Sequence, residues 1–288
     1  MQKTTTDTTV RAPTLLDFSG EAGLEGWDAR GQNFGVAWRR ATDNSDAAGF
    51  VVESPDEILL MVLDAPVTIE RRDAQETAVK APPRTLCIAP PGAWRLALSP
   101  GATCIALTSL RENTPCPAHN AAAYAERDAR IAPVGTPWRA LSGADTVRLL
   151  PIDEVQASKD KPRLKMLQTA TLSINWVEYD GPRDRTALSP HAHASFEQGS
   201  LGLAGNFVHH LRVPWGEDAN LWQEDRHAAL GSPSLMVVPV GLTHTSEGVG
   251  PGHHLLIDIF SPPRADFIAN GWVANSKDYA APDLPTGR

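Results

Sequence analysis

Two histidines and a glutamate in the second half of the chain have the residue types and spacing of a metal site. His191, His193 and Glu197 lie within the segment 189–199, which reads SPHAHASFEQG. Side chains alternate in direction along an extended segment, so all three are expected on one face. Imidazoles together with a carboxylate suit Fe(II), Mn, Ni, Cu or Zn, and such a ligand set leaves positions open for water or substrate.

A second segment, 239–244 (PVGLTH), is expected to complete this site. The Pro-x-Gly sequence at Pro239 predicts a turn, because Gly241 can adopt backbone conformations that other residues avoid. Such a turn would return His244 from a neighbouring strand as a fourth ligand. The elements that must position these residues are therefore short strands and turns.

The composition favours a globular all-β protein. The chain has 288 residues, 42% of them hydrophobic, which is enough for a sizeable core. Its 22 glycines and 24 prolines separate short apolar runs, as a many-stranded β protein requires. Strands are predicted at 34–39, 48–53, 57–63, 65–70, 85–89, 94–98, 103–110, 147–152, 164–169, 172–179, 199–204, 206–212, 234–238 and 254–260.

Charge and cysteine content exclude several function classes. The formal net charge is −8 and no long basic run occurs, which argues against nucleic acid or an anionic membrane surface as a partner and favours a small molecule. Cys87, Cys104 and Cys116 are few, odd in number and remote from the histidines, so we expect reduced thiols and no thiolate metal site. The polar start and the lack of a long apolar run predict a cytoplasmic protein.

The two halves of the chain are similar to each other. With an offset of 140 residues, 57–67 aligns with 197–207 without a gap, and Val51 and Glu53 then stand where His191 and His193 stand. With an offset of 149, Arg95 aligns with His244. A guanidinium offers no lone pair to a metal, so the site is expected only in the second copy.

These motifs resemble those of the cupin superfamily, in which HxHxxxE and PxGxxH supply metal ligands inside a double-stranded β-helix barrel. The resemblance implies that His191, His193, Glu197 and His244 bind the metal, and that the duplicated chain is a bicupin. One departure is that the glycine that closes the first motif comes one residue late, at Gly205.

The expected fold is all-β, with two tandem double-stranded β-helix (cupin, jelly-roll-like) barrels and few short helices. Residues 1–25 are predicted to form an N-terminal tail or arm and 26–116 a barrel without metal ligands. Residues 117–145 would be a linker, whose Ala-rich part at 118–130 could be one helix, and 146–288 the metal-binding barrel and tail. A short helical turn is expected at 265–270.

The substrate pocket is expected around the metal. Phe196, Phe207 and Trp222 could form an apolar wall, and His210 could contact substrate. Gln198 could hydrogen-bond a metal-bound ligand if the strand register slips by one residue, although strand alternation argues against this.

The leading functional hypothesis is a metal-dependent enzyme acting on a small organic substrate, with Fe(II) as the favoured ion and Mn, Ni, Cu or Zn as alternatives. The resemblance implies a non-haem Fe(II) dioxygenase. A non-redox isomerase or lyase, and a metal-anchored binding protein without catalysis, are the alternatives. A homodimer is expected, because apolar edge strands and an N-terminal arm favour pairing.

Overall fold

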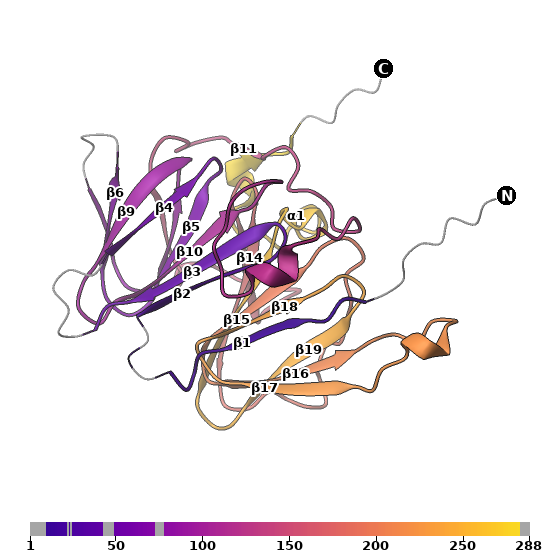
Figure 1. Ribbon diagram of the computed structural model, residues 1–288. Helices are drawn as coiled ribbons and strands as arrows, with labels where there is room; N and C mark the ends of the chain where they lie inside the picture. Colours follow the sequence, from indigo (N-terminus) through magenta and orange to yellow (C-terminus); the bar gives the residue numbers. More distant parts are fainter. Residues whose placement is uncertain (1–9, 22, 24, 43–48, 73–77, 283–288) are drawn as a thin grey trace, which may run out of the picture.

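The protein is described by a computed structural model that covers residues 10–21, 23, 25–42, 49–72 and 78–282. Strands dominate these residues and are arranged as two barrels packed against each other (Figure 1). The predicted fold class, all-β with two tandem barrels and few short helices, is confirmed.

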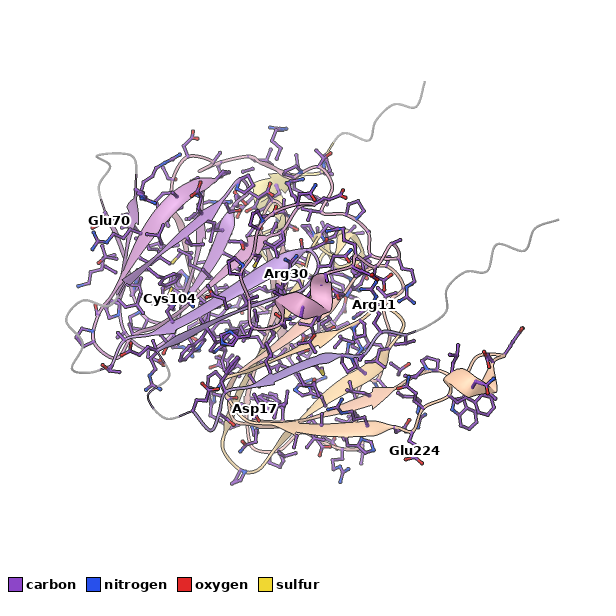
Figure 2. The ribbon with its side chains drawn as sticks, viewed as in Figure 1. Arg11, Asp17, Arg30, Glu70, Cys104 and Glu224 are labelled. Carbon is purple, nitrogen blue, oxygen red and sulfur yellow. The ribbon has the colours of Figure 1, made fainter. Side chains whose placement is uncertain are left out.

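The first barrel consists of a large and a small antiparallel sheet. Its strands are β2 (Gly26–Arg30), β3 (Phe34–Arg40), β4 (Gly49–Ser54), β5 (Ile58–Val62), β6 (Val67–Arg71), β7 (Val79–Ala81), β8 (Thr85–Ala89), β9 (Gly92–Leu98), β10 (Thr103–Ser109) and β12 (Arg148–Pro151). The large sheet has the order β12-β8-β5-β10-β3-β2 and the small sheet β4-β9-β6-β7. Its interior is filled with apolar side chains such as Leu60, Leu96 and Cys104, the last of which is labelled in Figure 2. Cys104 and the nearby Cys87 are buried free thiols.

The second barrel repeats this architecture. Its strands are β1 (Thr14–Asp17), β13 (Leu164–Gln168), β14 (Ser173–Asp180), β15 (Gln198–Ala204), β16 (Asn206–Arg212), β17 (Arg226–Leu230), β18 (Ser234–Val238), β19 (Thr243–Val249) and β20 (His253–Phe260). The large sheet has the order β1-β18-β15-β20-β14-β13 and the small sheet β17-β16-β19. His244 lies on β19, and His191 and His193 lie in the segment before β15. A bridge between His191 and His244 places this segment beside β19.

Helical structure is sparse. Among the described residues it comprises the 3-10 helices η1 (Ala121–Tyr124), η2 (Ala219–Leu221) and η3 (Ser276–Asp278) and the α-helix α1 (Ala265–Ala269), while β11 (Arg139–Ala140) pairs with β21 (Tyr279–Ala280). The helical turn predicted at 265–270 is confirmed by α1. No helix in the described part of the chain is long and apolar enough to cross a membrane.

The Ala-rich segment 118–130 does not form the single helix that its composition would allow. Only η1 is helical there, because polar side chains tie the segment to the first barrel. The Asn120 amide accepts from the backbone N–H of Arg30 and donates to its carbonyl oxygen, and the Asp128 N–H donates to Gln32. Bonds of this kind compete with helix formation.

The internal duplication is visible in the strand pairing. The central strands β5, β8 and β10 of the first barrel occupy the positions of β15, β18 and β20 in the second. Val51 pairs with Arg95 across β4 and β9, while His191 forms a bridge with His244. The same scaffold thus carries apolar and cationic residues in one copy and imidazoles in the other.

The two barrels exchange their edge strands. β1 precedes the first barrel in the chain but pairs with β18 of the second, and β12 follows the predicted linker but pairs with β8 of the first. The arm predicted at 1–25 contains the strand β1, followed by turns at 19–20 and 23, with residues 1–9, 22 and 24 lying outside the described residues. The boundaries proposed at 26 and 146 stay a prediction, since strands from either side cross them.

The large sheets of the two barrels pack face to face and form a shared core. Leu201 of β15 and Leu235 of β18 meet Trp38 of β3 and Met61 of β5 within one apolar cluster. Gly199 belongs to this contact, because a Cβ atom there would lie 2.9 Å from Cζ of Phe34. The position of β15 is therefore set by the first barrel.

Replacing Leu201 with alanine tests this shared core. Leu201 has 0% exposure, so L201A should lower the free energy of unfolding by about 2 to 5 kcal/mol through lost burial and a residual cavity. L141A, at a leucine with 51% exposure, is the control and should change it by less than about 0.5 kcal/mol. Urea denaturation measures both, and equal effects would contradict the proposed importance of the shared core.

Candidate metal centre

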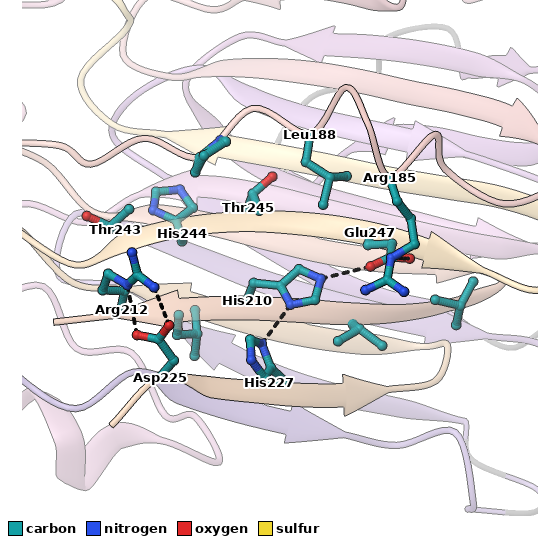
Figure 3. Close-up of a pocket in the computed structure, with 14 residues that line it drawn as sticks. Arg185, Leu188, His210, Arg212, Asp225, His227, Thr243, His244, Thr245 and Glu247 are labelled. Atoms are coloured by element: carbon teal, nitrogen blue, oxygen red, sulfur yellow. Dashed lines mark hydrogen bonds and ion pairs between the residues drawn. The ribbon is translucent and has the colours of Figure 1, made fainter. Parts of the chain in front are cut away.

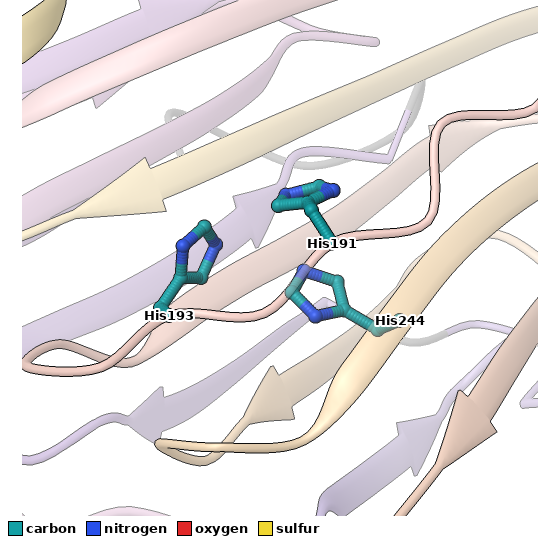
Figure 4. Close-up of side chains that lie close together, drawn as sticks. All are labelled: His191, His193 and His244. Atoms are coloured by element: carbon teal, nitrogen blue, oxygen red, sulfur yellow. The ribbon is translucent and has the colours of Figure 1, made fainter. Parts of the chain in front are cut away.

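Three of the expected ligands, His191, His193 and His244, lie together at the end of the second barrel (Figure 4). One ring nitrogen of each lies within 4.8 Å of those of the other two. The backbones of His191 and His244 exchange two hydrogen bonds, of 3.1 and 2.8 Å, which hold the two segments side by side. Gly241, with a φ of 83°, donates its N–H to the His193 carbonyl over 2.8 Å, so the Pro-x-Gly turn aligns both segments.

Hydrogen bonds to backbone carbonyls fix the tautomers of two of these imidazoles. Nδ1 of His191 lies 2.8 Å from the carbonyl oxygen of Ser189, and Nδ1 of His244 lies 3.0 Å from that of Leu242. A carbonyl oxygen can only accept, so each Nδ1 carries the proton and each Nε2 presents a lone pair. Partners of this kind commonly orient metal-binding histidines.

Burial keeps the imidazoles of His193 and His244 neutral. Desolvation lowers the pKa of His193 to about 3 and that of His244 to about 4, so neither is protonated at neutral pH. His193 and His244 are 6% and 1% exposed, whereas His191 is exposed toward the cavity described below. Neutral imidazole is the form that binds metal ions.

Gln198, and not Glu197, completes the group. Its Oε1 lies 2.9 Å from Nε2 of His193 and 3.2 Å from Nε2 of His244. The amide nitrogen of Gln198 donates to Asp258 Oδ1 over 2.9 Å and to Ser200 over 3.1 Å, which turns Oε1 toward the histidines.

The lone pairs in this group converge in a way that suits a cation. Because the single proton of neutral His244 is on Nδ1, its bare Nε2 faces the amide oxygen of Gln198 with no hydrogen between them. A divalent ion would satisfy both atoms. Three imidazole nitrogens and one amide oxygen are donors that such ions accept, so the residues present fit a bound divalent metal.

The structure does not bring Glu197 to the histidines, which corrects the expected ligand set. Its carboxylate points to the opposite side of the strand, where it accepts from the backbone N–H of Gln32 over 2.6 Å and from the Tyr124 hydroxyl over 3.3 Å. The chain bends at 194–195, between His193 and β15, and this bend breaks the alternation assumed for an extended segment. The late glycine at Gly205 is the available signal, since it implies that the second part of the motif is shifted by one residue.

A cavity of about 410 Å³ opens next to the centre, inside the barrel. His191, Gln198, His244 and Asp258 line its inner end. Apolar residues such as Leu256 and Phe260 line much of the remainder, together with four cationic residues, namely Lys161, Arg163, Arg183 and Arg264. The cavity is therefore suited to an anion of modest size. Sequence reasoning missed these cations, because they come from segments that are distant in the sequence and adjacent only after folding.

Of the four residues expected in the substrate pocket, only Phe196 lies beside the centre, with its ring 4.4 Å from that of His193. Phe207 is buried behind the centre, against His209 and His254. The remaining two, Trp222 and His210, do not line the cavity either, because Trp222 lies on a loop and His210 on the outer face of β16. In β16 the inward positions belong to Phe207 and His209, so alternation excludes His210.

The first barrel offers no comparable group among the residues that the structure describes. Its interior is apolar, and the position equivalent to His244 is Arg95, which lies on the outward-alternating side of β9. The candidate centre therefore lies in the second barrel.

No family model matches the chain, and no curated protein matches it. Several solved structures match the chain in fold. Oxalate decarboxylase from Lactobacillus farciminis, in complex with formate, is 11% identical, with 91% of this chain and 92% of the other covered and a TM-score of 0.56. AerE from Microcystis aeruginosa is 12% identical, with 89% and 100% covered and a TM-score of 0.52. A Bacillus subtilis oxalate decarboxylase studied for its Mn(II) centres is 12% identical, with 90% and 80% covered and a TM-score of 0.51.

At these identities the likeness shows the fold alone, and the fold is the cupin fold. It covers both barrels, so the pairing of two such units along one chain is shared with these structures. The chemistry of the site is argued from its own residues.

Removing single side chains tests the composition of the centre. H193A and H244A should each reduce the bound metal from about one equivalent to less than about a tenth, since each removes a ligand from a small neutral set. E197Q should retain its metal, because Glu197 faces the first barrel. Elemental analysis of protein purified without a histidine tag measures this, and loss of metal in E197Q would contradict the arrangement.

The burial of Glu197 predicts a pH-dependent effect of the same variant. Desolvation raises the pKa of Glu197 from 4.5 to about 7, so the folded protein binds this proton more tightly than the unfolded chain does. Stability due to this group is therefore present below about pH 4.5 and is lost as the pH rises to about 7. E197Q lacks this loss, so the stability of E197Q relative to the wild type should rise by up to about 3 kcal/mol between about pH 5 and pH 8.

Melting temperatures of both proteins across this pH range provide the measurement. All other titrating groups are common to the two proteins and cancel in the difference. A difference that is constant with pH would mean that Glu197 is ionised throughout.

Proposed function

We propose that the second barrel is the active site of a metal-dependent enzyme that acts on a small carboxylic acid by a non-redox reaction, as a lyase or an isomerase. The observation that carries this proposal is the position of a neutral three-histidine and glutamine centre at the inner end of a cavity lined by four cations. The metal and the cations would act on the same anionic substrate.

The neutrality of the ligand set favours this chemistry. Three imidazoles and an amide leave the full charge of a divalent ion uncompensated, whereas a glutamate ligand would cancel part of it. The bound ion would supply Lewis-acid polarisation of a substrate carbonyl or carboxylate oxygen.

The protein side chains bind and orient the substrate. Guanidinium groups form paired hydrogen bonds with carboxylates, which suits Arg163 and Arg183 to hold the end of the substrate that is remote from the centre. Arg264 contributes positive charge from a fixed position, since its guanidinium donates to the Asp266 carboxylate over 2.8 and 2.6 Å and lies 3.8 Å from the ring centroid of Phe267. A rigid cation of this kind fixes orientation at little entropic cost.

Asp258 and Ser200 act on the centre through Gln198. Asp258 accepts from the Gln198 amide and from the Ser200 hydroxyl, and so holds the amide oxygen in place. Burial raises the pKa of Asp258 to about 6. We assign Asp258 a positioning role.

The similar structures support the substrate class. Oxalate decarboxylase is named for a small dicarboxylate, and one of these structures holds formate, another carboxylate. The proposal extends to the class of small carboxylic acids and not to oxalate itself, because the likeness is one of fold.

A non-haem Fe(II) dioxygenase is the second candidate. Imidazole donors suit Fe(II) better than they suit Mn, which prefers oxygen ligands. Phe196 and Phe260 place aromatic rings beside His193, an apolar surrounding compatible with bound O₂. A binding protein without turnover would use the same anion site.

Assays with and without oxygen distinguish the candidates. Metal-loaded protein is incubated with a panel of small hydroxy, oxo and dicarboxylic acids, and product formation and O₂ uptake are followed together. We expect turnover at equal rates in air and under nitrogen. O₂ uptake matched to product would favour the dioxygenase, and tight binding without product would favour the binding protein.

Replacing a cation in the cavity tests the substrate class. R163Q should raise KM for an active acid about 10- to 100-fold, the range for one charged hydrogen bond, with a smaller effect on kcat. Arg163 is exposed, so the variant should fold normally. R226Q, at an exposed arginine of β17 outside the cavity, is the control and should leave KM unchanged. An unchanged KM in R163Q would contradict this role for Arg163.

A further inference from the structure

The connection between β16 and β17, residues 213–225, projects away from the second barrel (Figure 1). Six large hydrophobic residues are exposed in the described part of the chain, and three of them lie in this short connection. They are Trp215, Leu221 and Trp222, with exposures of 73%, 41% and 44%. Apolar side chains gathered at one projecting tip are typical of a contact surface.

The tip holds its tryptophans in a defined arrangement. The rings of Trp215 and Trp222 are stacked, with centroids 4.5 Å apart and planes inclined by 9°. The Trp222 indole N–H donates to the carbonyl oxygen of Gly216 over 2.9 Å, and Asp218 caps η2 by accepting from the Asn220 N–H. The stacked pair is therefore pre-organised for contact, which lowers the entropic cost of binding.

The charge of this connection limits what it can contact. Residues 213–225 include Glu217, Asp218 and Glu224, besides Asp225, which is paired with Arg212 of the same copy, and no lysine or arginine. Glu224 is labelled in Figure 2 near the base of the projection. Two such tips placed against each other would bring like charges together, so a tip-to-tip contact between two copies is disfavoured.

A groove on the same barrel has the complementary character. This groove lies on the outer face of the small sheet and has a volume of about 660 Å³ (Figure 3). Leu188, Val208 and Val249 give it an apolar lining. The cationic groups of Arg185 and Arg212 are presented to solvent, with side-chain exposures of 76% and 66%.

The acidic partners of these arginines are less accessible. Glu247, which pairs with both Arg185 and His210, is 8% exposed, and Asp225, which pairs with Arg212, is 36% exposed. The mouth of the groove therefore presents more positive than negative charge. An acidic, aromatic tip is complementary to such a groove in apolar character and in charge.

We propose that the tryptophan tip of one copy inserts into the outer groove of a second copy, and that the exchange is reciprocal about a two-fold axis. Reciprocal exchange gives a closed dimer, because each copy provides one tip and one groove. A tryptophan offers roughly 150–250 Å², and because Trp215 and Trp222 are 73% and 44% exposed, the four tryptophans of two tips would supply up to about a third of the roughly 1,600 Å² of a standard interface. The surrounding contacts of the groove provide the rest.

Sedimentation velocity of the full-length protein at micromolar concentration tests the proposal. The wild type is expected at twice the chain mass of 31.0 kDa. The double variant W215A/W222A should raise the dimer dissociation constant at least about 30-fold, because central tryptophans dominate interface energetics. R185E should also weaken the dimer, since it replaces the exposed cation of the groove with a charge that repels the tip.

Matched controls separate this contact from other causes. V51A, which removes a hydrophobic side chain that is 50% exposed on the first barrel, should leave the dimer unchanged. Circular dichroism and metal content of all variants should match the wild type, because the tip and the groove mouth lie outside both cores. A monomeric wild type, or a dimer that persists in W215A/W222A, would overturn the proposal. Dissociation in W215A/W222A with an intact dimer in R185E would overturn the assignment of the groove.

Discussion

Strand β15 is buried on both faces, and the rest of the structure depends on which of its residues faces which way. Leu201 points into the core shared by the two barrels, while Gln198 and Ser200 point into the second barrel beside the histidines. A shift of one residue would exchange these two sets and place apolar side chains at the centre. The hydrogen bond from the Gln32 N–H to Glu197 ties the start of the strand to the first barrel and so opposes such a shift. The first barrel thereby contributes to the geometry of a centre to which it supplies no ligand.

The two barrels use one scaffold for two purposes. In the first, the interior is filled with buried apolar side chains, whose burial adds stability. In the second, part of the interior is given to buried polar groups that hydrogen-bond to one another, and the bare Nε2 of His244 faces the Gln198 oxygen, an arrangement that a bound ion would complete. The first copy therefore serves as a support for the copy that holds the candidate centre, through the face-to-face packing of the large sheets.

The all-β class, the duplication and most of the strands can be predicted from the sequence, because short apolar runs between glycines and prolines are a local signal. The strand β19 is not predicted although it carries His244, since its sequence THTSEGV is polar and lacks a clear apolar alternation. A helix over 118–130 does not form because Asn120 and Asp128 bond to a barrel that is remote in sequence. Propensity alone cannot account for such contacts.

The candidate site is predictable in part. The His-x-His pair and the Pro-x-Gly turn are local patterns, and they are sufficient to single out His191, His193 and His244. Strand alternation favours Glu197 over Gln198, but it does not hold through a bend whose position the sequence does not reveal. Trp222 has a residue type that suits a substrate pocket, but it lies outside the cavity. Its location is set by the length and direction of the connection between β16 and β17, which the sequence does not reveal.

The exchange of edge strands between the barrels has a consequence for the order of folding. β1 can pair only after β18 has been synthesised, and Thr14 and Val237 are separated by most of the chain. Closing so long a loop is slow, since its entropic cost must be met before the contacts form. The first barrel can assemble around β5 and β8 while the ribosome is still producing the second. Its edge strand β12 can pair with β8 only after residues 148–151 have been synthesised. Docking of the N-terminal strand is therefore expected among the last steps of folding, so the second barrel, with its histidines, reaches its final form only once the chain is complete.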